Sequence, residues 1–227
     1  MRLKNRRFAL LLAGANWRER LIAGVGAVIG IGLCAAISTL ATPSHGLLLA
    51  APLGASAVLL FAVPSSPLAQ PWPIVGGNVV SALVGVVVAH QLGSGALAVG
   101  VAVGASILAM SVLRCLHPPG GGTVLLPLLA PAVLAQGYGF ALLPVGLNAV
   151  ALVAVGIAFH RISGHSYPHR AMKIADRPRL LMEDIDAALE ESGETFDVSR
   201  EDLEALLDRA ERHAAARRIA TARPPRT

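Results

Sequence analysis

The sequence predicts an all-α membrane protein: a polytopic transmembrane bundle of about six apolar segments, followed by a short helical cytoplasmic tail. The chain has 227 residues and is 54% hydrophobic. Between Glu19 and Asp176 it contains no acidic residue, and between Arg20 and Arg161 its only Lys or Arg is Arg114. A water-soluble domain of that length needs a charged surface, so the solvent of this stretch must be lipid.

Six apolar runs divide this stretch, at Leu21–Leu40, Gly46–Val63, Ile74–Leu92, Ala96–Leu113, Thr123–Gln136 and Phe140–His160. A membrane span needs roughly 20 residues, or about 17 at the short end. The fifth run is shorter and contains two prolines, and the second contains Pro52 and ends at Pro64. We expect these two runs to be broken or partly re-entrant helices, which a bilayer tolerates only inside protein or beside a cavity. The other four are expected to be plain helices.

Basic residues flank both ends of the apolar stretch. Those before it are Arg2, Lys4, Arg6, Arg7, Arg18 and Arg20, and those after it are Arg161, His165, His169, Arg170 and Lys173. Positive flanks mark the cytoplasmic side, so both termini should be cytoplasmic, as expected in a bacterial inner membrane. Six spans satisfy both ends and five do not. A four-span arrangement, in which the two proline-bearing runs dip without crossing, also satisfies them and stays open.

The charge pattern divides the chain into three parts: a basic N-terminal segment (1–20), a transmembrane domain (21–160) and a cytoplasmic helical tail (161–227). Arg6-Arg7 followed by a short apolar run resembles a signal peptide. Cleavage would leave Arg18 and Arg20 outside, against the charge rule, so we expect an uncleaved interfacial segment. The excess of positive charge lies beside the first span and does not indicate nucleic-acid binding.

Aligned prolines indicate an internal repeat. Ala51–Ser56 matches Pro118–Thr123, Pro64 matches Pro131 at the same offset, and Val75–Asn78 matches Val145–Asn148 at a slightly longer one. Chance similarity among Gly/Ala/Val segments is the alternative. If the repeat is real, each half holds three spans and the second half is inverted. Inverted halves with interrupted helices at corresponding positions favour a substrate site between them.

The tail carries every acidic residue except Glu19. Its apolar spacing predicts amphipathic helices at about Pro178–Ser192 and Ser199–Arg218. Ser199 and Asp202 form an imperfect capping box. The apolar face of the second helix should pack on the first tail helix or on a second copy of the chain.

The strongest local signal for chemistry is the motif His117-Pro118-Pro119-Gly120-Gly121-Gly122-Thr123. Prolines fit the first turn of a helix, and glycines allow close approach. The amides of Gly120 to Thr123 would then be unpaired donors at a helix start, which favours anion binding. Pro52, Gly54 and Ser56 would offer a weaker version from the other half, and Arg114 the only fixed positive charge.

Each candidate also has a structural interpretation. The alternative role of Arg114 is to flank and anchor the fourth span, and the alternative role of His117 is to cap the turn on which it lies. Asn78 and Asn148 are polar residues in apolar helices, which often bridge neighbouring helices. His90 and His160 lie near span ends, where we expect them at the interface.

Several classes of function are not expected. Without acidic residues the bundle holds no catalytic triad, carboxylate pair or carboxylate-based coupling site, and it contains no nucleotide-binding loop. Cys34 and Cys115 give no disulfide framework, and Cys115 with His117 is too little for a metal site. We therefore expect no enzyme, no cofactor and no metal.

The sequence resembles the HPP family of integral membrane proteins, named after the motif that stands here at 117–119. Three stretches carry the resemblance: Ser66–Gln70 with Pro71, Gly76–Asn78 and Ser81-Ala82; Leu116–Gly121; and Gly164–Arg170. It implies a bundle usually described as four spans. The tail near Asp197–Leu203 resembles the linker before paired CBS domains in longer bacterial members, and we expect this protein to be a member without those domains. Plastid relatives are described as nitrite transporters.

Two functions follow as expectations. The first is a transporter or channel for a small anion, nitrite by family resemblance, because a site without acids suits an anion or a neutral solute. The second is a non-transporting membrane module whose tail positions a cytoplasmic partner. The partners expected are the lipid bilayer, a small anion and a second copy of the chain.

Overall fold

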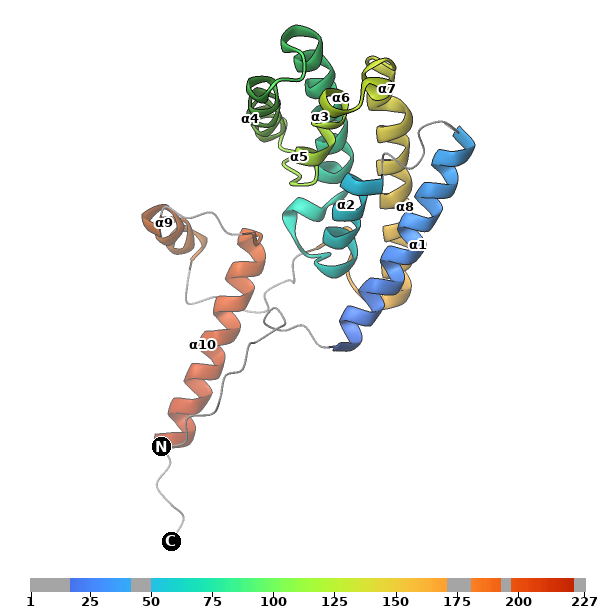
Figure 1. Cartoon of the computed structure of the whole chain (residues 1–227). Helices are drawn as coiled ribbons and strands as arrows, with labels where there is room; N and C mark the ends of the chain where they lie inside the picture. Colours follow the sequence, from blue (N-terminus) through green and yellow to red (C-terminus); the bar gives the residue numbers. More distant parts are fainter. Residues whose placement is uncertain (1–16, 42–49, 171–180, 193–196, 223–227) are drawn as a thin grey trace, which may run out of the picture. The chain divides into compact units, whose positions relative to one another are not determined.

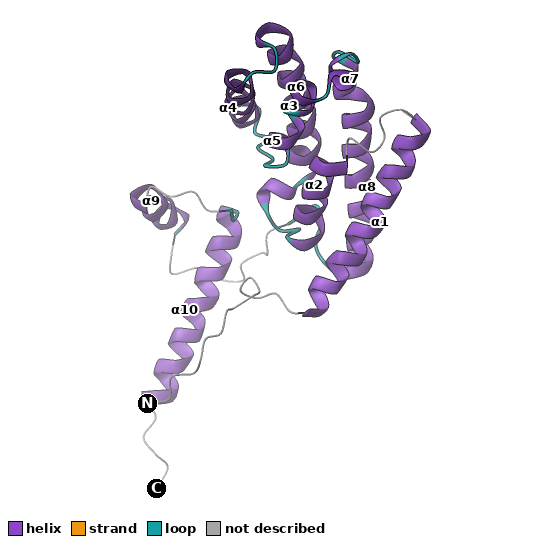
Figure 2. Ribbon diagram, viewed as in Figure 1, coloured by secondary structure: helices purple, strands orange, loops and turns teal. Residues whose placement is uncertain are grey.

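The fold was taken from a computed structural model, which describes residues 17–41, 50–170, 181–192 and 197–222. Every regular element among these residues is helical (Figure 2), which confirms the all-α prediction. The basic segment before Trp17, the start of the second apolar run (Gly46–Leu49), Lys173 and the start of the first tail helix (Pro178–Leu180) lie outside the described residues. The chain forms two compact units, residues 1–64 with 68–168, and residues 65–67 with 169–227.

The first unit is the membrane bundle (Figure 1). Its elements are α1 (Trp17–Ala41), α2 (Ala50–Ala62), η1 (Pro67–Ala69), α3 (Pro71–Leu92), α4 (Ala96–Val112), α5 (Gly120–Thr123), α6 (Leu126–Leu129), α7 (Pro131–Leu134), η2 (Ala141–Gly146) and α8 (Leu147–Ser163).

Three helices of the described chain are long and apolar enough to cross a membrane: Trp17–Leu40, Pro71–Leu92 and Ala141–Ser163. Three shorter apolar helices lie between them, at Pro52–Ala62, Ala96–Val112 and Gly120–Leu129. The first, third and sixth predicted runs therefore reach spanning length. The fourth is a plain helix of 17 residues, at the short end of what a bilayer needs.

The fifth predicted run is broken, as its prolines indicate. Its first part joins the preceding glycines in the short helix of α5 and α6, and α7 follows as a single turn after the break at Ala130. Ala130, between α6 and α7, has an extended backbone (φ −126°, ψ 101°) because it precedes Pro131, whose ring disfavours the helical conformation of the residue before it.

The sixth predicted run is not the plain helix that the sequence led us to expect. It begins with a wide helical turn, η2, in which Leu143 has non-helical backbone angles (φ −126°, ψ 108°). Pro144 causes the break, since it has no N–H and restricts the residue before it. Regular α-helix follows from Leu147.

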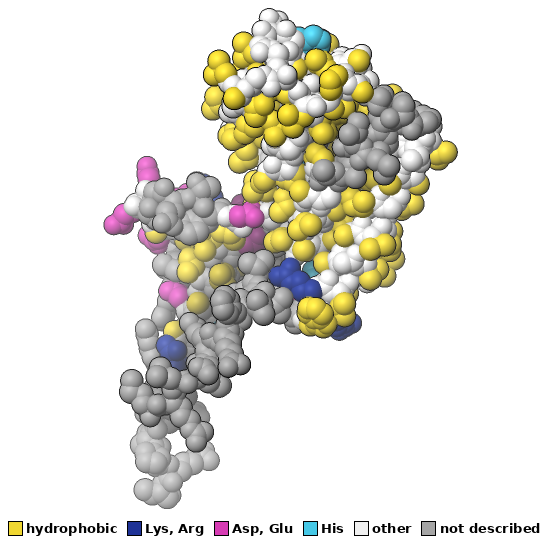
Figure 3. Space-filling view, in the orientation of Figure 1, with side chains coloured by type: hydrophobic (Ala, Val, Ile, Leu, Met, Phe, Trp, Pro, Cys, Tyr) yellow, Lys and Arg dark blue, Asp and Glu magenta, His cyan; other side chains and the backbone are white. Residues whose placement is uncertain are grey.

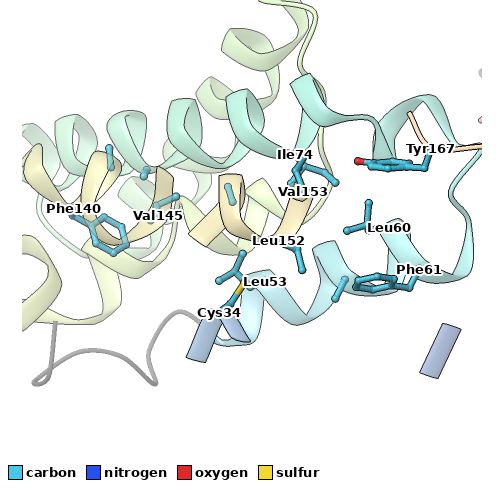
Figure 4. Close-up of a cluster of buried hydrophobic side chains, with 14 of the residues drawn as sticks. Cys34, Leu53, Leu60, Phe61, Ile74, Phe140, Val145, Leu152, Val153 and Tyr167 are labelled. Atoms are coloured by element: carbon cyan, nitrogen blue, oxygen red, sulfur yellow. The ribbon is translucent and has the colours of Figure 1, made fainter. Parts of the chain in front are cut away.

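The bundle core lies where α1, α2, α3 and α8 meet (Figure 4). Phe61 on α2 fits against α1 at two glycines: a Cβ built on Gly26 or Gly30 would lie 2.5 Å or 2.7 Å from its ring. Small residues that allow close helix approach replace the hydrophobic driving force that lipid cannot provide. The outer face carries exposed apolar side chains such as Val28 (74%) and Leu108 (69%), as expected for contact with lipid (Figure 3).

The second unit holds the tail helices α9 (Met182–Ser192) and α10 (Arg200–Ala222), which contact each other. Ile185 and Ala205 are buried. Half of the predicted capping box forms: the Asp202 amide donates to Ser199 Oγ at 3.1 Å, whereas the Asp202 carboxylate accepts from the Ser199 hydroxyl. Leu206, which the sequence placed on the packed face, is 61% exposed.

Candidate functional site

Four of the predicted site residues form one buried hydrogen-bonded cluster, here called the polar cluster: Ser56, Asn78, His117 and Thr123. They come from α2, α3, the segment before α5, and α5 itself. None is more than 1% exposed. The sequence pattern therefore identified a set of residues that the fold brings together.

The donors and acceptors of the polar cluster follow from one fixed partner. His117 Nδ1 lies 2.9 Å from the carbonyl oxygen of Leu68, which can only accept, so Nδ1 carries the proton. In the neutral ring Nε2 is then an acceptor, and the Ser56 hydroxyl donates to it at 2.8 Å. The Asn78 amide group donates to the Ile74 carbonyl at 2.8 Å and approaches Ser56 Oγ at 3.4 Å.

Thr123 completes the cluster from the other side. Its hydroxyl donates to Asn78 Oδ1 at 2.6 Å. Asn78 therefore bridges α2 and α5, which are far apart in sequence. Buried groups that are satisfied in this way fix the relative position of the helices that carry them.

Two glycines admit this arrangement by close contact. A Cβ on Gly77 would lie 2.5 Å from His117 Cβ and 2.7 Å from the Cys115 carbonyl, and a Cβ on Gly120 would lie 2.5 Å from Ser81 Oγ. By contrast, nothing lies within 4 Å of a Cβ on Gly121 or Gly54. Packing therefore requires glycine at position 120 of the motif and not at position 121.

The amides of the glycine motif are not free donors, which corrects the sequence-based interpretation. Those of Gly120, Gly121 and Gly122 donate to the carbonyls of His117, Pro118 and Pro119 at 2.8–3.0 Å. The Thr123 amide donates to the Pro119 carbonyl at 3.2 Å. The prolines start a tight turn whose carbonyls lie within reach of these amides, so backbone donors do not form an anion site here.

Arg114 does not belong to the buried polar cluster. It is exposed, has a positive φ of 53°, and follows the end of α4. This placement agrees with the flank interpretation.

Asn148 belongs to a second, separate cluster between α8 and α1. Its amide group donates to Ser38 Oγ at 2.6 Å and to the Pro144 carbonyl at 2.9 Å. Asn78 and Asn148 thus each bond the carbonyl four residues earlier and reach across to another helix. Both bridge helices, which is the structural interpretation that the sequence allowed.

A cavity of about 540 Å³, open on one side to the outside of the bundle, adjoins the polar cluster. It lies between α2 and the α5–α6 segment and is lined by Pro52, Ala55, Leu59, Pro118, Pro119, Gly122 and Leu126. Its walls are apolar. Ser56 and His117 each follow or precede a lining residue directly, so the polar cluster lies immediately behind the wall.

Sequence reasoning missed the role of the short segment η1. The Leu68 carbonyl accepts from His117, and the neighbouring Ala69 carbonyl accepts from the Tyr167 hydroxyl at 2.9 Å. Burial raises the pKa of Tyr167, which keeps this hydroxyl protonated as a donor. The three stretches that carried the family resemblance therefore meet at η1.

His160 was expected at the interface and is instead buried, with 1% exposure. Its Nε2 donates to the Leu60 carbonyl at 2.9 Å. The end of an apolar run does not always lie at the membrane surface. Residues after α8 fold back over the end of this helix, and the ring of Tyr167 lies beside that of His160. Among the residues described, no group of three His, Cys, Asp or Glu could hold a metal ion.

Comparison with known proteins gives a family and no activity. Two proteins of Dictyostelium discoideum, both named only as transmembrane proteins, are each 34% identical to the chain. One matches over 119 residues (50% of this chain, 42% of the relative), and the other over 107 residues (45% and 34%). The chain thus spans less than half the length of these relatives. No solved structure matches.

A profile of the family described as "HPP, transmembrane region" matches residues 13–168. The match covers α1 to α8, including η1, the polar cluster and Tyr167, and is more than half of the chain. By this match, the chain belongs to the HPP family of membrane proteins.

Proposed function

We propose that the protein transports a small anion across the membrane between α2 and α5, with nitrite as the substrate that the family resemblance suggests. The observation that carries the proposal is the cavity at this contact, because both halves of the predicted repeat line it, with three residues from the first half and four from the second. The bundle is proposed to consist of two inverted halves, α1–α3 and α4–α8.

The cavity lining supports the repeat. Three residues of α2 line it, and each has a counterpart in the other wall at one constant separation along the chain. The pairs are Pro52 with Pro119, Ala55 with Gly122, and Leu59 with Leu126. Only Pro118 has no partner in this set. We call these six residues the seam.

Helix packing supports the repeat independently. The first helix of each half packs against the last helix of the other: α1 against α8, and α4 against α3. The middle elements α2 and α5 contact each other, and so do α3 and α8. A pseudo-two-fold axis between the halves would produce both kinds of contact and would pass beside the seam. Transporters with inverted repeats bind substrate at such an interface.

The charges of the bundle favour an anion. No carboxylate lies between residues 21 and 160, so nothing there attracts a cation or repels an anion by full charge. With the backbone amides occupied, the donors available are side chains of the polar cluster. An apolar wall can hold a pathway closed by excluding water. In the proposed cycle the seam opens and exposes Ser56, His117 and Thr123 to the substrate.

Flux into liposomes tests the proposal. Reconstituted protein should carry nitrite faster than protein-free liposomes, with nitrate and chloride measured alongside. Gly122→Val places a branched side chain in the cavity and should reduce flux at least tenfold, since it obstructs the seam. His117→Ala removes the central acceptor and should reduce it as well.

Gly104→Val is the matched control, because Gly104 lies on α4 with nothing within 4 Å of its Cβ. Equal flux in wild-type protein and in Gly122→Val at equal incorporation would place the pathway elsewhere. Absence of flux for all three anions would reject transport of small anions. It would favour the alternative, a membrane module whose tail positions a cytoplasmic partner.

A further inference from the structure

An apolar groove runs along the outer face of the bundle between α1 and α8 and shares no lining residue with the seam. It encloses about 540 Å³ and is lined by Arg18, Leu21, Ile22, Val25, Ile29, Phe159, Ile162 and Ser163. The α1 residues recur every three or four positions, so they form one stripe of the helix. Figure 1 shows the two helices side by side. We propose that this groove is a binding site for one anionic phospholipid.

The length of the groove fits one lipid chain. Arg18 and Ile29 lie eleven residues apart on α1, which is about 16 Å along a helix. Half of a bilayer's hydrocarbon core is about 15 Å thick. The groove is thus long enough to extend from the membrane surface to the midplane of the bilayer, as an acyl chain does.

The depth of the groove in the membrane is set by its end residues. Trp17, at the start of α1, is 70% exposed, and tryptophan concentrates at the level of the lipid headgroups. Arg18 follows it and is exposed. Below them Leu21, Val25 and Ile29 are 43–57% exposed, as expected for side chains that contact lipid. A cation at headgroup level above an apolar channel matches the two chemical parts of a phospholipid.

Charge decides between lipid and protein as the occupant. The residues that precede α1 include Arg2, Lys4, Arg6 and Arg7 and no acid, so their positive charge would be repelled by that of Arg18. A second copy would present the same arginine. Glu19 follows Arg18 but does not line the groove. An anionic headgroup is complementary to Arg18, and juxtamembrane basic residues attract such lipids.

The two tryptophans of the full-length chain provide the test. Trp72→Phe leaves Trp17 as a reporter beside the groove, and Trp17→Phe leaves Trp72, which lies on α3 with its Nε1 donating to the Leu113 carbonyl. Each protein is reconstituted in phosphatidylcholine vesicles with a small fraction of dibrominated phosphatidylglycerol or dibrominated phosphatidylcholine. Brominated chains quench a tryptophan only on contact.

Brominated phosphatidylglycerol should be enriched about fivefold over brominated phosphatidylcholine at Trp17, the effect expected of one arginine, and not at Trp72. Arg18→Gln should abolish the excess, and Arg18→Lys should keep most of it. Arg161→Gln, which removes an exposed charge that does not line the groove, should leave it unchanged.

Five results would overturn the proposal. The first four are equal quenching of Trp17 by both lipids, the same excess at Trp72, an excess that survives in folded Arg18→Gln protein, and an excess that Arg161→Gln removes equally. Absence of quenching at Trp17 by either lipid would also overturn it, because the groove would then be covered by protein. Emission of Trp72 in the Trp17→Phe background reports whether each arginine variant is folded.

Discussion

Asn78 is the residue on which the polar cluster depends, because it accepts from Thr123 and donates toward Ser56 and to its own helix. Removing one partner of a buried hydrogen bond leaves the other unsatisfied, which costs more than the bond itself contributes. The unfolded chain also finds hydrogen-bond partners within a membrane, so the free energy measured for the loss of one such bond is modest.

Thr123→Val should therefore destabilise the protein by about 1 kcal/mol, since it keeps the shape of the side chain and leaves Asn78 Oδ1 without its donor. The measurement is the free energy of unfolding in bicelles. Thr39→Val is the control, because Thr39 is exposed and bonds only a carbonyl of its own helix, that of Ala36. An equal loss of unfolding free energy in both variants would mean that the hydrogen bond between α3 and α5 contributes no more to stability than the exposed bond of Thr39.

Gly77→Ala should be more damaging, by about 1–3 kcal/mol, because its Cβ would collide with His117 Cβ and a backbone carbonyl. Gly104→Ala, in open space on α4, should be neutral or stabilising, since alanine favours helix by about 1 kcal/mol. Thermal unfolding of both variants in one detergent tests this. Comparable unfolding temperatures would show that α3 shifts freely at this position.

At this scale the sequence identified His117, Ser56, Asn78 and Thr123 but not how they interact. Residue type and the proline alignment selected polar groups in an apolar stretch, and such groups must find partners inside the bundle. The role proposed for the amides failed, because whether a backbone donor is free depends on turn geometry. Leu68 could not be found at all, since its contribution is a carbonyl oxygen and any residue has one.

At the scale of elements, proline was the most reliable guide. It placed the break before Pro131, whereas the described part of the second run forms one unbroken helix, α2, with Pro52 in its first turn. The same rule applied to Pro144 would have revealed the kink that begins the last span. The fourth run was predicted to within one residue, since Ala96–Leu113 forms α4, which ends at Val112.

The tail should be separable from the bundle. A chain ending at Arg170 retains the whole bundle core, and the acidic faces of α9 and α10 cannot enter lipid cheaply. We expect this truncated chain to insert into the membrane in full amount, as measured by membrane fractionation. Degradation of the truncated protein would show that the tail is structural.

Within the tail, Ser199→Ala should destabilise α10 by about 1 kcal/mol, because Ser199 accepts the Asp202 amide at the start of the helix. Circular dichroism of the isolated tail peptide, melted beside a Ser192→Ala control at the end of α9, measures the effect. Equal melting of the two peptides would count against the cap.

For the whole molecule, we expect both termini to lie on the same side of the membrane, because the number of predicted crossings is even and both flanks are basic. Reporter fusions at Ala15 and after Arg170 should both give cytoplasmic signals. An external signal from either fusion would exclude the six-span and the four-span arrangements alike. The number of crossings was the hardest property to predict, because the short α2 and the divided α5–α7 segment are apolar without reaching the length of a span.

The two bonds that hold η1 also bear on how this family can vary. His117 and Tyr167 both donate to main-chain oxygens, those of Leu68 and Ala69. No substitution at 68 deletes its carbonyl, whereas almost any substitution at 117 deletes the imidazole. Substitutions should therefore be tolerated at one residue of this contact and not at the other. In a saturation library, position 68 should accept many apolar side chains, while position 117 should accept almost none, although the two residues share the same bond.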